Sequence, residues 1–293
     1  MIPKKQDILS LCDAAMMVKR FFFETRWGAK SLVALYISVV SGIVVAWQYA
    51  PENPFYSASS LDLLIPFGLF WRSLHFYSSQ IFFLLSIIHL LVILFGTAPR
   101  LSLGKWIWLN ATMPVALLLL FTGYVLRGDA TGESAGLIAE NICLAIPVVG
   151  KMINSLLFAI SEEGMKRVYA NHVIGLAVLW VIFAWDHLRR YRVQVSEHGG
   201  LIVAILGVAV MWNAPMEPMQ LGVFHISGPW FFLGLQELLR YVQPFWAGVV
   251  FPLFFLVAQA FLDAGQPVGR WARFFAGGWL FFYGIATLVA LGR

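Results

Sequence analysis

Charged residues are scarce in this chain. Only 12% of its 293 residues are Asp, Glu, Lys or Arg, whereas 60% are hydrophobic. Soluble globular domains carry about 25% charged residues, so this chain has too few to cover a water-exposed surface. A disordered chain is excluded as well, because low hydrophobicity is the signature of disorder. The composition therefore predicts a membrane protein.

Cysteine is nearly absent too. Cys12 and Cys143 are the two cysteines, and the chain has no C-x-x-C-H haem c attachment site and no C-x-x-C metal pair. These absences exclude a disulfide framework, and we expect both cysteines to be free thiols. The net charge of +5 is compatible with nucleic-acid binding. Membrane proteins, however, collect Lys and Arg in their cytoplasmic loops, so we expect no nucleic-acid partner.

The first thirty residues place basic side chains around short apolar stretches: Lys4, Lys5, Lys19, Arg20, Arg26 and Lys30. A signal peptide needs an uninterrupted apolar stretch of about 7–15 residues, which this segment does not have. Residues 1–30 are therefore predicted to form an amphipathic helix on the cytoplasmic membrane surface, with its basic residues toward the lipid headgroups.

Several segments approach the roughly 20 apolar residues that a helix needs to cross ~30 Å of hydrocarbon. There are seven of them, at about 31–49, 68–95, 106–126, 169–188, 200–213, 244–263 and 272–291. The fifth is the shortest. The sequence thus predicts an all-α membrane protein with about seven transmembrane helices.

Loop charges set the orientation of these spans. Basic residues collect in the loops of one side: Arg100, Lys105, Arg189, Arg190, Arg192, Arg270 and Arg273. By the positive-inside rule this is the cytoplasmic or n side, so we expect a bacterial inner-membrane protein with a cytoplasmic N-terminus. The opposite or p side holds the connections 51–62, 127–167 and 214–243. Loops longer than about 12–15 residues are commonly functional, which predicts a site on the p side.

Four histidines stand inside two of the predicted spans. His75 and His89 are fourteen residues apart, and His172 and His187 are fifteen apart. At about 100° per residue these spacings return to within about 40° and about 60° of the starting direction, so each pair lies on one helix face. The members of a pair are ~21–22 Å apart along the helix axis. Because both spans start on the p side, His75 can meet His172 there, while His89 meets His187 near the n side.

Ionisable residues inside a membrane indicate a function by default. A transmembrane histidine can instead bond a neighbouring carbonyl or serine, but two matched pairs favour metal ligation. Zinc fits poorly, because each level offers two ligands and a structural zinc site usually takes four. Two haem b groups, each with its iron between two imidazoles, fit better. Gly28 and Gly42, also fourteen residues apart, would let a neighbouring helix approach the porphyrins closely.

Four motifs surround these histidines: Gly68-Leu-Phe-Trp-Arg-Ser-Leu-His75, Gly123-Tyr-Val-Leu-Arg-Gly-Asp129, Ala145-Ile-Pro-Val-Val-Gly150 and Arg167-Val-Tyr-Ala-Asn-His172. Together they resemble cytochrome b of the Rieske/cytochrome b complexes. The fifteen-residue histidine spacing and the Ile-Pro-Val-Val-Gly element resemble the chloroplast and cyanobacterial form most. The last hundred residues, with Asn213-Ala-Pro-Met-Glu-Pro218 and Trp230-Phe-Phe-Leu233, resemble its companion subunit IV.

The resemblance implies a cytoplasmic segment over 1–30, a four-helix di-haem domain over 31–195 and a three-helix, subunit IV-like domain over 196–293. It implies two haem b groups, with these residues as metal ligands or at the porphyrins: His75, His172, His89, His187, Gly28, Gly42 and Gly123. Arg72 and Arg167 match basic residues near the propionates of the p-side haem. Arg192 matches an arginine near the n-side haem and quinone.

The resemblance also implies a quinol-oxidising redox subunit, as in a quinol:cytochrome c oxidoreductase. A p-side quinol site would be built from the 127–167 connection and the segment around Trp230. Electrons would pass through both haems to a quinone site on the n side. The chain has no iron–sulfur or haem c ligands, so a Rieske iron–sulfur protein or a multihaem cytochrome c subunit would accept the other electron. Other membrane subunits, lipid and a homodimer follow from the same resemblance.

Several positions depart from the family. Its Pro-Glu-Trp-Tyr motif reads Gly-Pro229-Trp-Phe here, so the carboxylate thought to accept a quinol proton is missing. Leu109 replaces a glycine of the third span, and Val92 replaces an arginine. Arg26 stands where the chloroplast form attaches a further haem to cysteine, so that haem is not expected.

The missing glutamate keeps a second function open: a di-haem anchor that links a periplasmic dehydrogenase or hydrogenase to the quinone pool. A haem-free transporter is a third alternative, which would leave the histidine pairing unexplained.

Three other side chains have two interpretations each. On a continuous helix Glu237 would lie within about 20° of Trp230, so it either replaces the missing glutamate or pairs with Arg240. Asp186 either relays a proton to the n-side quinone or pairs with Arg189 or Arg190. His225 either contacts quinol or a partner, or is an exposed loop residue.

The loop charges predict the topology directly. A reporter tag inserted after Arg192 should face the cytoplasm, and a tag near Pro54 should face the opposite compartment. Protease protection of the two tags in oriented vesicles measures this. The reversed pattern would contradict every n-side and p-side assignment made above.

Overall fold

The computed structural model describes residues 17, 20–96, 101–218, 226–265 and 267–293. All regular elements in these residues are helices, which confirms the all-α fold. In chain order they are α2 (Trp27–Gln48), α3 (Pro54–Leu64), α4 (Gly68–Phe95), α5 (Leu103–Asn110), α6 (Thr112–Val125), α7 (Ala130–Leu144), α8 (Gly150–Leu157), η1 (Ile160–Glu162), α9 (Met165–Ala170), η2 (Asn171–Gly175), α10 (Leu176–Leu188), η3 (Val195–His198), α11 (Gly199–Met211), α12 (Leu233–Leu238), η4 (Trp246–Val250), α13 (Phe251–Ala260) and α14 (Val268–Leu291). Cys12, Arg100, His225 and most of the predicted surface segment 1–30 lie outside the described residues.

Five stretches are long and apolar enough to cross a membrane: Trp27–Gln48, Gly68–Phe95, Leu103–Val125, Met165–Leu188 and Val268–Leu291. They match five of the predicted spans. The other two predicted spans contain shorter apolar helices, Val195–Met211 and Trp246–Ala260. α11 itself has 13 residues, and its rise of ~20 Å is less than the ~30 Å of hydrocarbon. The described residues thus hold seven apolar helices, five of them of spanning length.

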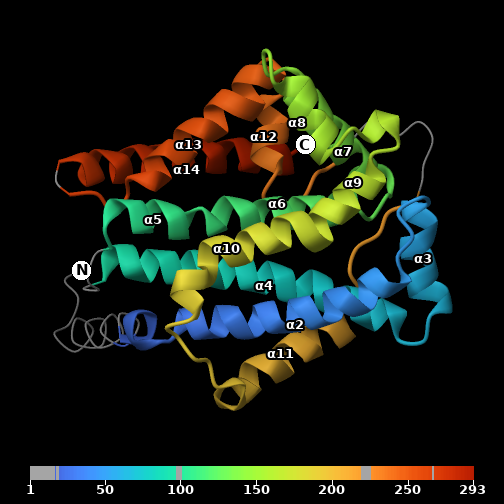
Figure 1. Ribbon diagram of the computed structural model, residues 1–293, viewed down its shortest axis with the longest axis horizontal. Helices are drawn as coiled ribbons and strands as arrows, with labels where there is room; N and C mark the ends of the chain where they lie inside the picture. The colour runs from blue at the N-terminus through green and yellow to red at the C-terminus, as the bar shows by residue number, and fades with distance from the viewer. Residues whose placement is uncertain (1–16, 18–19, 97–100, 219–225, 266) are drawn as a thin grey trace, which may run out of the picture.

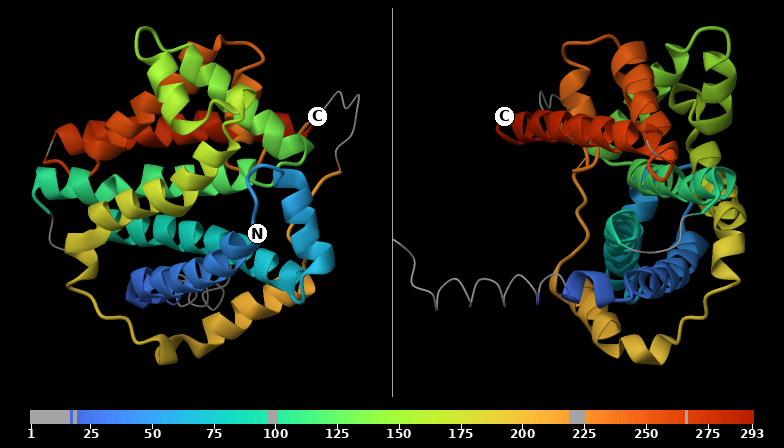
Figure 2. Two further views of the ribbon diagram at one scale, coloured as in Figure 1. Left: turned by 45° about the vertical axis from the view of Figure 1, so that its right-hand side comes forward. Right: turned by 90° about the vertical axis from the view of Figure 1, so that its left-hand side faces the viewer.

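The long helices lie side by side (Figure 1). α4, α5–α6 and α10 form the middle of the bundle, α11 crosses beneath α2 and α4, and α13 and α14 cover α5–α6 (Figures 1 and 2). The short helices α3, α7, α8 and α9 lie toward the right-hand end in Figure 1. Both α4 and α9–α10 begin at that end, so it carries the connections predicted for the p side.

α2 and α4 pack closely because small residues line their interface. Ala34 and Ser41 of α2 and Ser78 of α4 are completely buried. The Ser31 and Ser86 hydroxyls lie 2.7 Å apart across the interface. Small and hydroxyl side chains are the usual means by which membrane helices approach one another. This packing brings the glycines of α2 within contact distance of the α4 histidines.

The third predicted span is interrupted at Ala111, between α5 and α6. Pro114 explains the break, because a helical proline clashes with the carbonyl four residues earlier, here that of Asn110. The buried Asn110 side chain turns to α13: its Nδ2 donates to the Gln259 carbonyl at 3.0 Å, and its Oδ1 accepts from Gln259 Nε2 at 3.2 Å. These bonds fasten α13 to the third span.

The 127–167 connection is held together by a buried carboxylate, that of Glu140 on α7. It accepts hydrogen bonds from Asn154 Nδ2 on α8 at 2.9 Å, from the Ser161 hydroxyl at 2.9 Å and from the Ser161 amide at 3.0 Å. Burial disfavours the charged form, but these hydrogen bonds outweigh it and hold the pKa of Glu140 below its ordinary value. One turn further along α7, Cys143 is a buried free thiol, as predicted.

The lowered Glu140 pKa predicts a pH-dependent stability of this connection. Its stabilising contribution is complete above the unfolded pKa of about 4.3 and is lost as the pH falls through the lower folded pKa. Limited proteolysis of the purified protein between pH 7 and 3 should therefore show opening of the loop between α7 and α9 at the acid end. Glu140→Gln should remove part of this pH dependence, whereas the exposed Glu133→Gln should not. Identical acid profiles for wild type and Glu140→Gln would contradict the assignment.

Candidate functional site

The four membrane histidines lie in two pairs between α4 and the α9–α10 helix. The ring centroids of His75 and His172 are 6.2 Å apart, and those of His89 and His187 are also 6.2 Å apart. The ring planes cross at 87° in the first pair and 48° in the second. These are the two pairs that the sequence spacing predicts.

A π-helical turn explains how unequal spacings produce matched pairs. η2, a π-helix over Asn171–Gly175, contains His172 at the junction of α9 and α10. A π-bulge inserts one extra residue into an α-helix and often marks a functional site. The fifteen residues from His172 to His187 therefore turn through nearly the same angle as the fourteen from His75 to His89.

The separation of the rings fits a shared metal ion. A histidine nitrogen coordinates a transition metal at ~2 Å and lies ~1.1 Å from its ring centre, so two rings on one ion have centres about 6 Å apart. Both observed separations agree with this geometry. Aromatic rings that merely pack together also have centroid separations of about 4.5–7 Å. The surroundings of the rings must therefore distinguish metal ligation from simple packing.

Three glycines lie against the histidine rings. A Cβ added at Gly42 would lie 2.7 Å from Cε1 of His75, and one at Gly123 would lie 3.0 Å from Cε1 of His172. A Cβ added at Gly28 would lie 3.0 Å from Cε1 of His89. Any side chain at these positions would push the imidazoles out of place. Each level thus holds two imidazoles at a metal-binding separation with a glycine against at least one ring, an arrangement that fits a metal group ligated by both rings.

The Nδ1 atoms of the first pair have hydrogen-bond partners. Nδ1 of His75 lies 2.8 Å from the Ser38 carbonyl, and Nδ1 of His172 lies 2.9 Å from the Thr122 hydroxyl. A carbonyl only accepts, so Nδ1 of His75 carries the proton and Nε2 keeps its lone pair. A neutral imidazole with a free Nε2 is the form that binds a metal.

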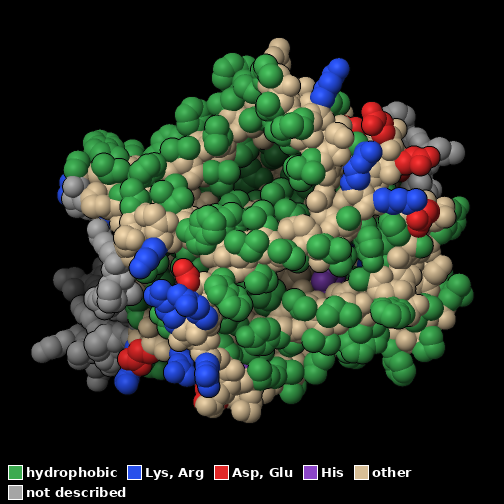
Figure 3. Space-filling model, in the orientation of Figure 1, with side chains coloured by type: hydrophobic (Ala, Val, Ile, Leu, Met, Phe, Trp, Pro, Cys, Tyr) green, Lys and Arg blue, Asp and Glu red, His purple; other side chains and the backbone are tan. Residues whose placement is uncertain are grey.

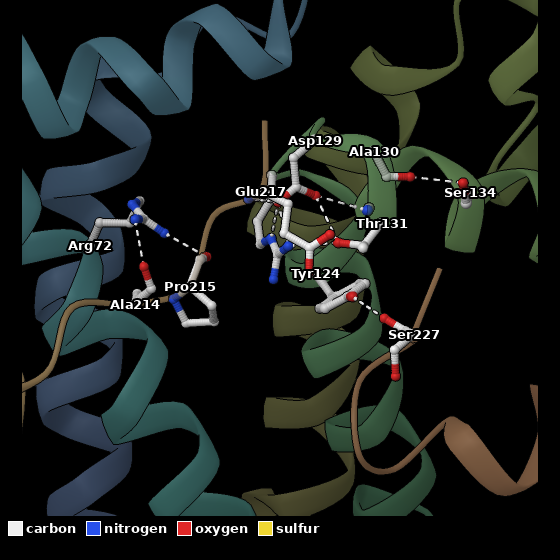
Figure 4. Close-up of polar contacts among 12 residues, drawn as sticks. Arg72, Tyr124, Asp129, Ala130, Thr131, Ser134, Ala214, Pro215, Glu217 and Ser227 are labelled. Atoms are coloured by element: carbon white, nitrogen blue, oxygen red, sulfur yellow. Dashed lines mark hydrogen bonds and ion pairs between the residues drawn. The ribbon is translucent and has the colours of Figure 1, made fainter. Parts of the chain in front are cut away.

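The predicted arginines differ in their surroundings. Arg72 is buried and forms a two-pronged ion pair with Asp62, at 2.7 and 2.6 Å. It also donates to the Ala214 carbonyl at 2.8 Å (Figure 4). Arg167 on α9 and Arg192 beyond α10 are exposed. Asp62 was not among the predicted site residues. Its position ten residues before Arg72, across the α3–α4 turn, gave no recognisable spacing.

A second polar cluster missed by the sequence analysis surrounds Asp129, which is completely buried at the start of α7. Its carboxylate caps α7 by accepting from the Gly132 amide at 2.9 Å, pairs with Arg127, and accepts from the Glu217 amide at 2.9 Å. The Arg127 guanidinium lies 4.4 Å from the centre of the Tyr124 ring. Figure 4 shows this cluster joining α6, α7 and the 214–217 segment. The one sequence signal was the Arg-Gly-Asp spacing within the third-span motif.

Trp230 is 47% exposed, and its Nε1 donates to Gln80 Oε1 on α4 at 2.9 Å. An apolar cavity of about 490 Å³ opens between Trp230, Phe231 and the outer side of α14. On the other side, Phe232 is buried against α6 and α7 through Phe121 and Ala139. The Trp230 segment therefore touches the 127–167 connection, the contact expected of a p-side site.

Glu237 is buried but does not share a helix with Trp230. The turn after Pro229, with the Phe232 amide donating to its carbonyl at 2.7 Å, delays the start of α12 to Leu233. The assumption of one continuous helix from Trp230 to Glu237 is therefore wrong. The predicted ion pair with Arg240 is present at 3.4 Å, and Arg293 joins it at 3.2 Å.

Asp186 pairs with Arg189 at 2.9 Å, one of the two partners predicted for it. Both side chains are exposed. Next to it, the His187 ring packs against the Tyr191 ring at 4.8 Å between centroids. Arg26, at the position of the absent third-haem cysteine, lies 3.4 Å from Glu197.

The fold and the site define a membrane helix bundle built around two histidine pairs, one at each of two depths. Residues 14–194 match the sequence model of the Cytochrome b/b6/petB family. This match covers more than half of the chain, which therefore belongs to the cytochrome b/b6 family. The resemblance inferred from the motifs is confirmed, and membership of this family implies haem cofactors.

Individual relatives extend the comparison. The chain is 28% identical to cytochrome b6 of Heliomicrobium gestii, over 57% of this chain and 81% of that protein. It is 25% identical over 276 residues to cytochrome b of Dictyostelium citrinum, which covers 80% of this chain and 71% of that one. A solved structure titled "Hyperthermophilic respiratory Complex III" superposes with a TM-score of 0.55 at 18% identity, covering 91% of this chain and 92% of that chain. This last likeness establishes the fold alone.

Proposed function

We propose that this chain is the di-haem cytochrome b subunit of a quinol-oxidising complex. His75 and His172 hold one haem b near the p side, and His89 and His187 hold the other near the n side. The observation that carries the proposal is the pair of 6.2 Å histidine separations, each bordered by a glycine where a side chain would displace the ring. Membership of the cytochrome b/b6 family supports it.

The bound haems would supply one-electron transfer between the two membrane faces. The chain's own residues fix their positions. Two long helices set the imidazole levels ~21 Å apart, and Gly28, Gly42 and Gly123 leave room for the imidazole rings that would ligate the haems. Arg72 and Arg167 would offer cations to the propionates at the p side, and Arg192 at the n side. For Arg72 this requires exchange of its present partner Asp62.

The p-side quinol site would lie where Trp230, α7 and the end of α6 meet. Phe231 and Phe232 supply apolar walls there, and the Asp129 cluster fixes the surrounding loops. Glu237 is our candidate for the proton acceptor in place of the family's motif glutamate. Its carboxylate faces Arg240 and Arg293, whose positive charges stabilise the carboxylate, and the Tyr241 hydroxyl, which can both donate and accept a proton.

On the n side, we propose that Asp186 passes protons to a quinone near His187. The whole unit would sit in a bacterial inner membrane with its N-terminus in the cytoplasm. In Figure 3, Lys and Arg side chains gather toward the lower left of the face shown, whereas at the right-hand end they are interspersed with Asp and Glu. This difference between the two ends supports the orientation. The proposed regions remain 1–30, 31–195 and 196–293, the last corresponding to subunit IV.

A complete enzyme would need further subunits. With two cysteines in the whole chain, the high-potential electron acceptor would be a Rieske iron–sulfur protein or a multihaem cytochrome c. We also propose that the chain contacts other membrane subunits and lipid and that it forms a homodimer.

One observation favours a second function, a di-haem anchor joining a periplasmic dehydrogenase or hydrogenase to the quinone pool. Pro229 occupies the motif glutamate position, and proline cannot accept a proton. Inhibition by p-site quinol analogues distinguishes the two functions. The quinol-oxidising complex should be inhibited, whereas an anchor that reduces quinone only at the n side should not be.

Removing one axial imidazole should cost one haem rather than two, because the two levels use separate ligands. Ala at His75 or His172 should abolish the p-side b-haem absorbance component, and Ala at His89 or His187 the n-side one. Reduced-minus-oxidised spectra of purified variants measure this. His198→Ala, at a half-buried histidine outside both pairs, serves as a control and should keep both components. If His75→Ala and His89→Ala remove the same component, the pairing is wrong.

Glu237→Gln should lower p-side quinol oxidation by roughly 10²–10⁴-fold, the usual contribution of a positioned proton acceptor. Both haems should be retained, and the pH dependence of turnover should change. The exposed Glu133→Gln on the same side provides the matched control. Unchanged turnover with an unchanged pH profile in Glu237→Gln would exclude this role and leave Glu237 as a structural ion pair.

A further inference from the structure

The hydroxyl of Thr122, on α6, has two kinds of neighbour. It lies 2.9 Å from Nδ1 of His172, and 2.8 Å from the carbonyl of Leu118 and 3.2 Å from that of Leu119. Thr122 is 3% exposed, so water cannot take part freely. The next residue, Gly123, is the one that leaves room for the His172 ring. Two consecutive residues of α6 thus hold one histidine.

The direction of the hydrogen bond follows from counting protons. A threonine hydroxyl has one hydrogen, and backbone carbonyls can only accept. The hydroxyl donates to the Leu118 carbonyl at 2.8 Å, the usual back-bond of a helical threonine. The hydroxyl oxygen then accepts from Nδ1–H of His172. This fixes the tautomer and leaves the lone pair on Nε2 for a metal.

The second ligand of the same level is fixed in the same way, since Nδ1 of His75 donates to the Ser38 carbonyl at 2.8 Å. The other level differs. Among the described residues, the ring nitrogens of His89 and His187 have no such hydrogen bond, and the His187 ring instead packs on Tyr191. In the described residues, protein groups therefore accept hydrogen bonds from the imidazoles of the first pair but not from those of the second pair.

Hydrogen bonds to the distal nitrogen of a ligating histidine raise its basicity. A more basic ligand stabilises ferric iron more than ferrous iron and so lowers the reduction potential, one of the means by which proteins tune haems. Building on the proposed function, we infer that Thr122 is a positioning residue that lowers the potential of the p-side haem relative to the n-side haem. Electrons entering from the p side would then move toward the higher potential.

Optical redox titration of the purified complex tests this inference. Thr122→Val keeps the shape of the side chain but removes the hydroxyl, and Thr122→Ser keeps the hydroxyl. Thr122→Val should raise the p-side midpoint potential by ~59 mV, which corresponds to a tenfold change in the ferric-to-ferrous equilibrium for one electron. The n-side potential should stay constant, and Thr122→Ser should behave as wild type. Thr112→Val is the matched control on the same helix, because its hydroxyl bonds the Leu109 carbonyl rather than a histidine.

Unchanged potentials in Thr122→Val with both haems bound would overturn the inference. So would equal shifts, or equal haem loss, in the Val and Ser variants, because the effect would then come from packing. Loss of the p-side haem in Thr122→Val but not in Thr122→Ser would support the hydroxyl's role. Failure of the proposed function shows itself separately, in a wild-type complex without two b haems or without quinol oxidation.

Discussion

A polar ring inside a membrane protein needs partners, because an unsatisfied hydrogen-bonding group costs several kcal/mol away from water. In this chain four imidazoles lie between the same two helices, α4 and α9–α10, and the bundle is arranged around them. α2 approaches α4 through small residues such as Ala34 and Ser41, and its glycines then touch His75 and His89. α6 supplies Thr122 and Gly123 to His172. A larger residue at any of these contacts would move a ring whose position matters to within tenths of an ångström.

The connections predicted for the p side keep their shape by a different means. They are long and apolar and lie at the proposed quinol site, so their shape cannot come from burial alone. Buried charges fix them instead: Asp129 with Arg127, Arg72 with Asp62, and Glu140 with its hydrogen-bond donors. Breaking a buried pair by removing one partner commonly costs about 3–5 kcal/mol, since the other charge is left uncompensated. These clusters hold the walls of the proposed quinol site rigid while leaving its apolar lining free for substrate.

The sequence made the histidine pairs predictable, because side-chain spacing on a helix converts directly into direction and height. The same reasoning found Gly28, Gly42 and the Arg240 partner of Glu237. It could not foresee the π-helical turn at His172, which depends on tertiary packing rather than on residue preference. The condition that Trp230 and Glu237 share one continuous helix is not met, because the Pro229 turn delays the start of α12 to Leu233. Asp62 was missed because its ion pair with Arg72 depends on tertiary structure alone. The helix α11 is shorter than the span predicted there.

The central claim is that this chain binds two haems between its histidine pairs. The most direct measurement is the haem-to-protein ratio of the complex purified from native membranes, combined with electron paramagnetic resonance of the oxidised form. The account predicts two b haems per chain, both low-spin with two imidazole ligands. One haem per chain, none, or a high-spin haem with a single histidine ligand would contradict it.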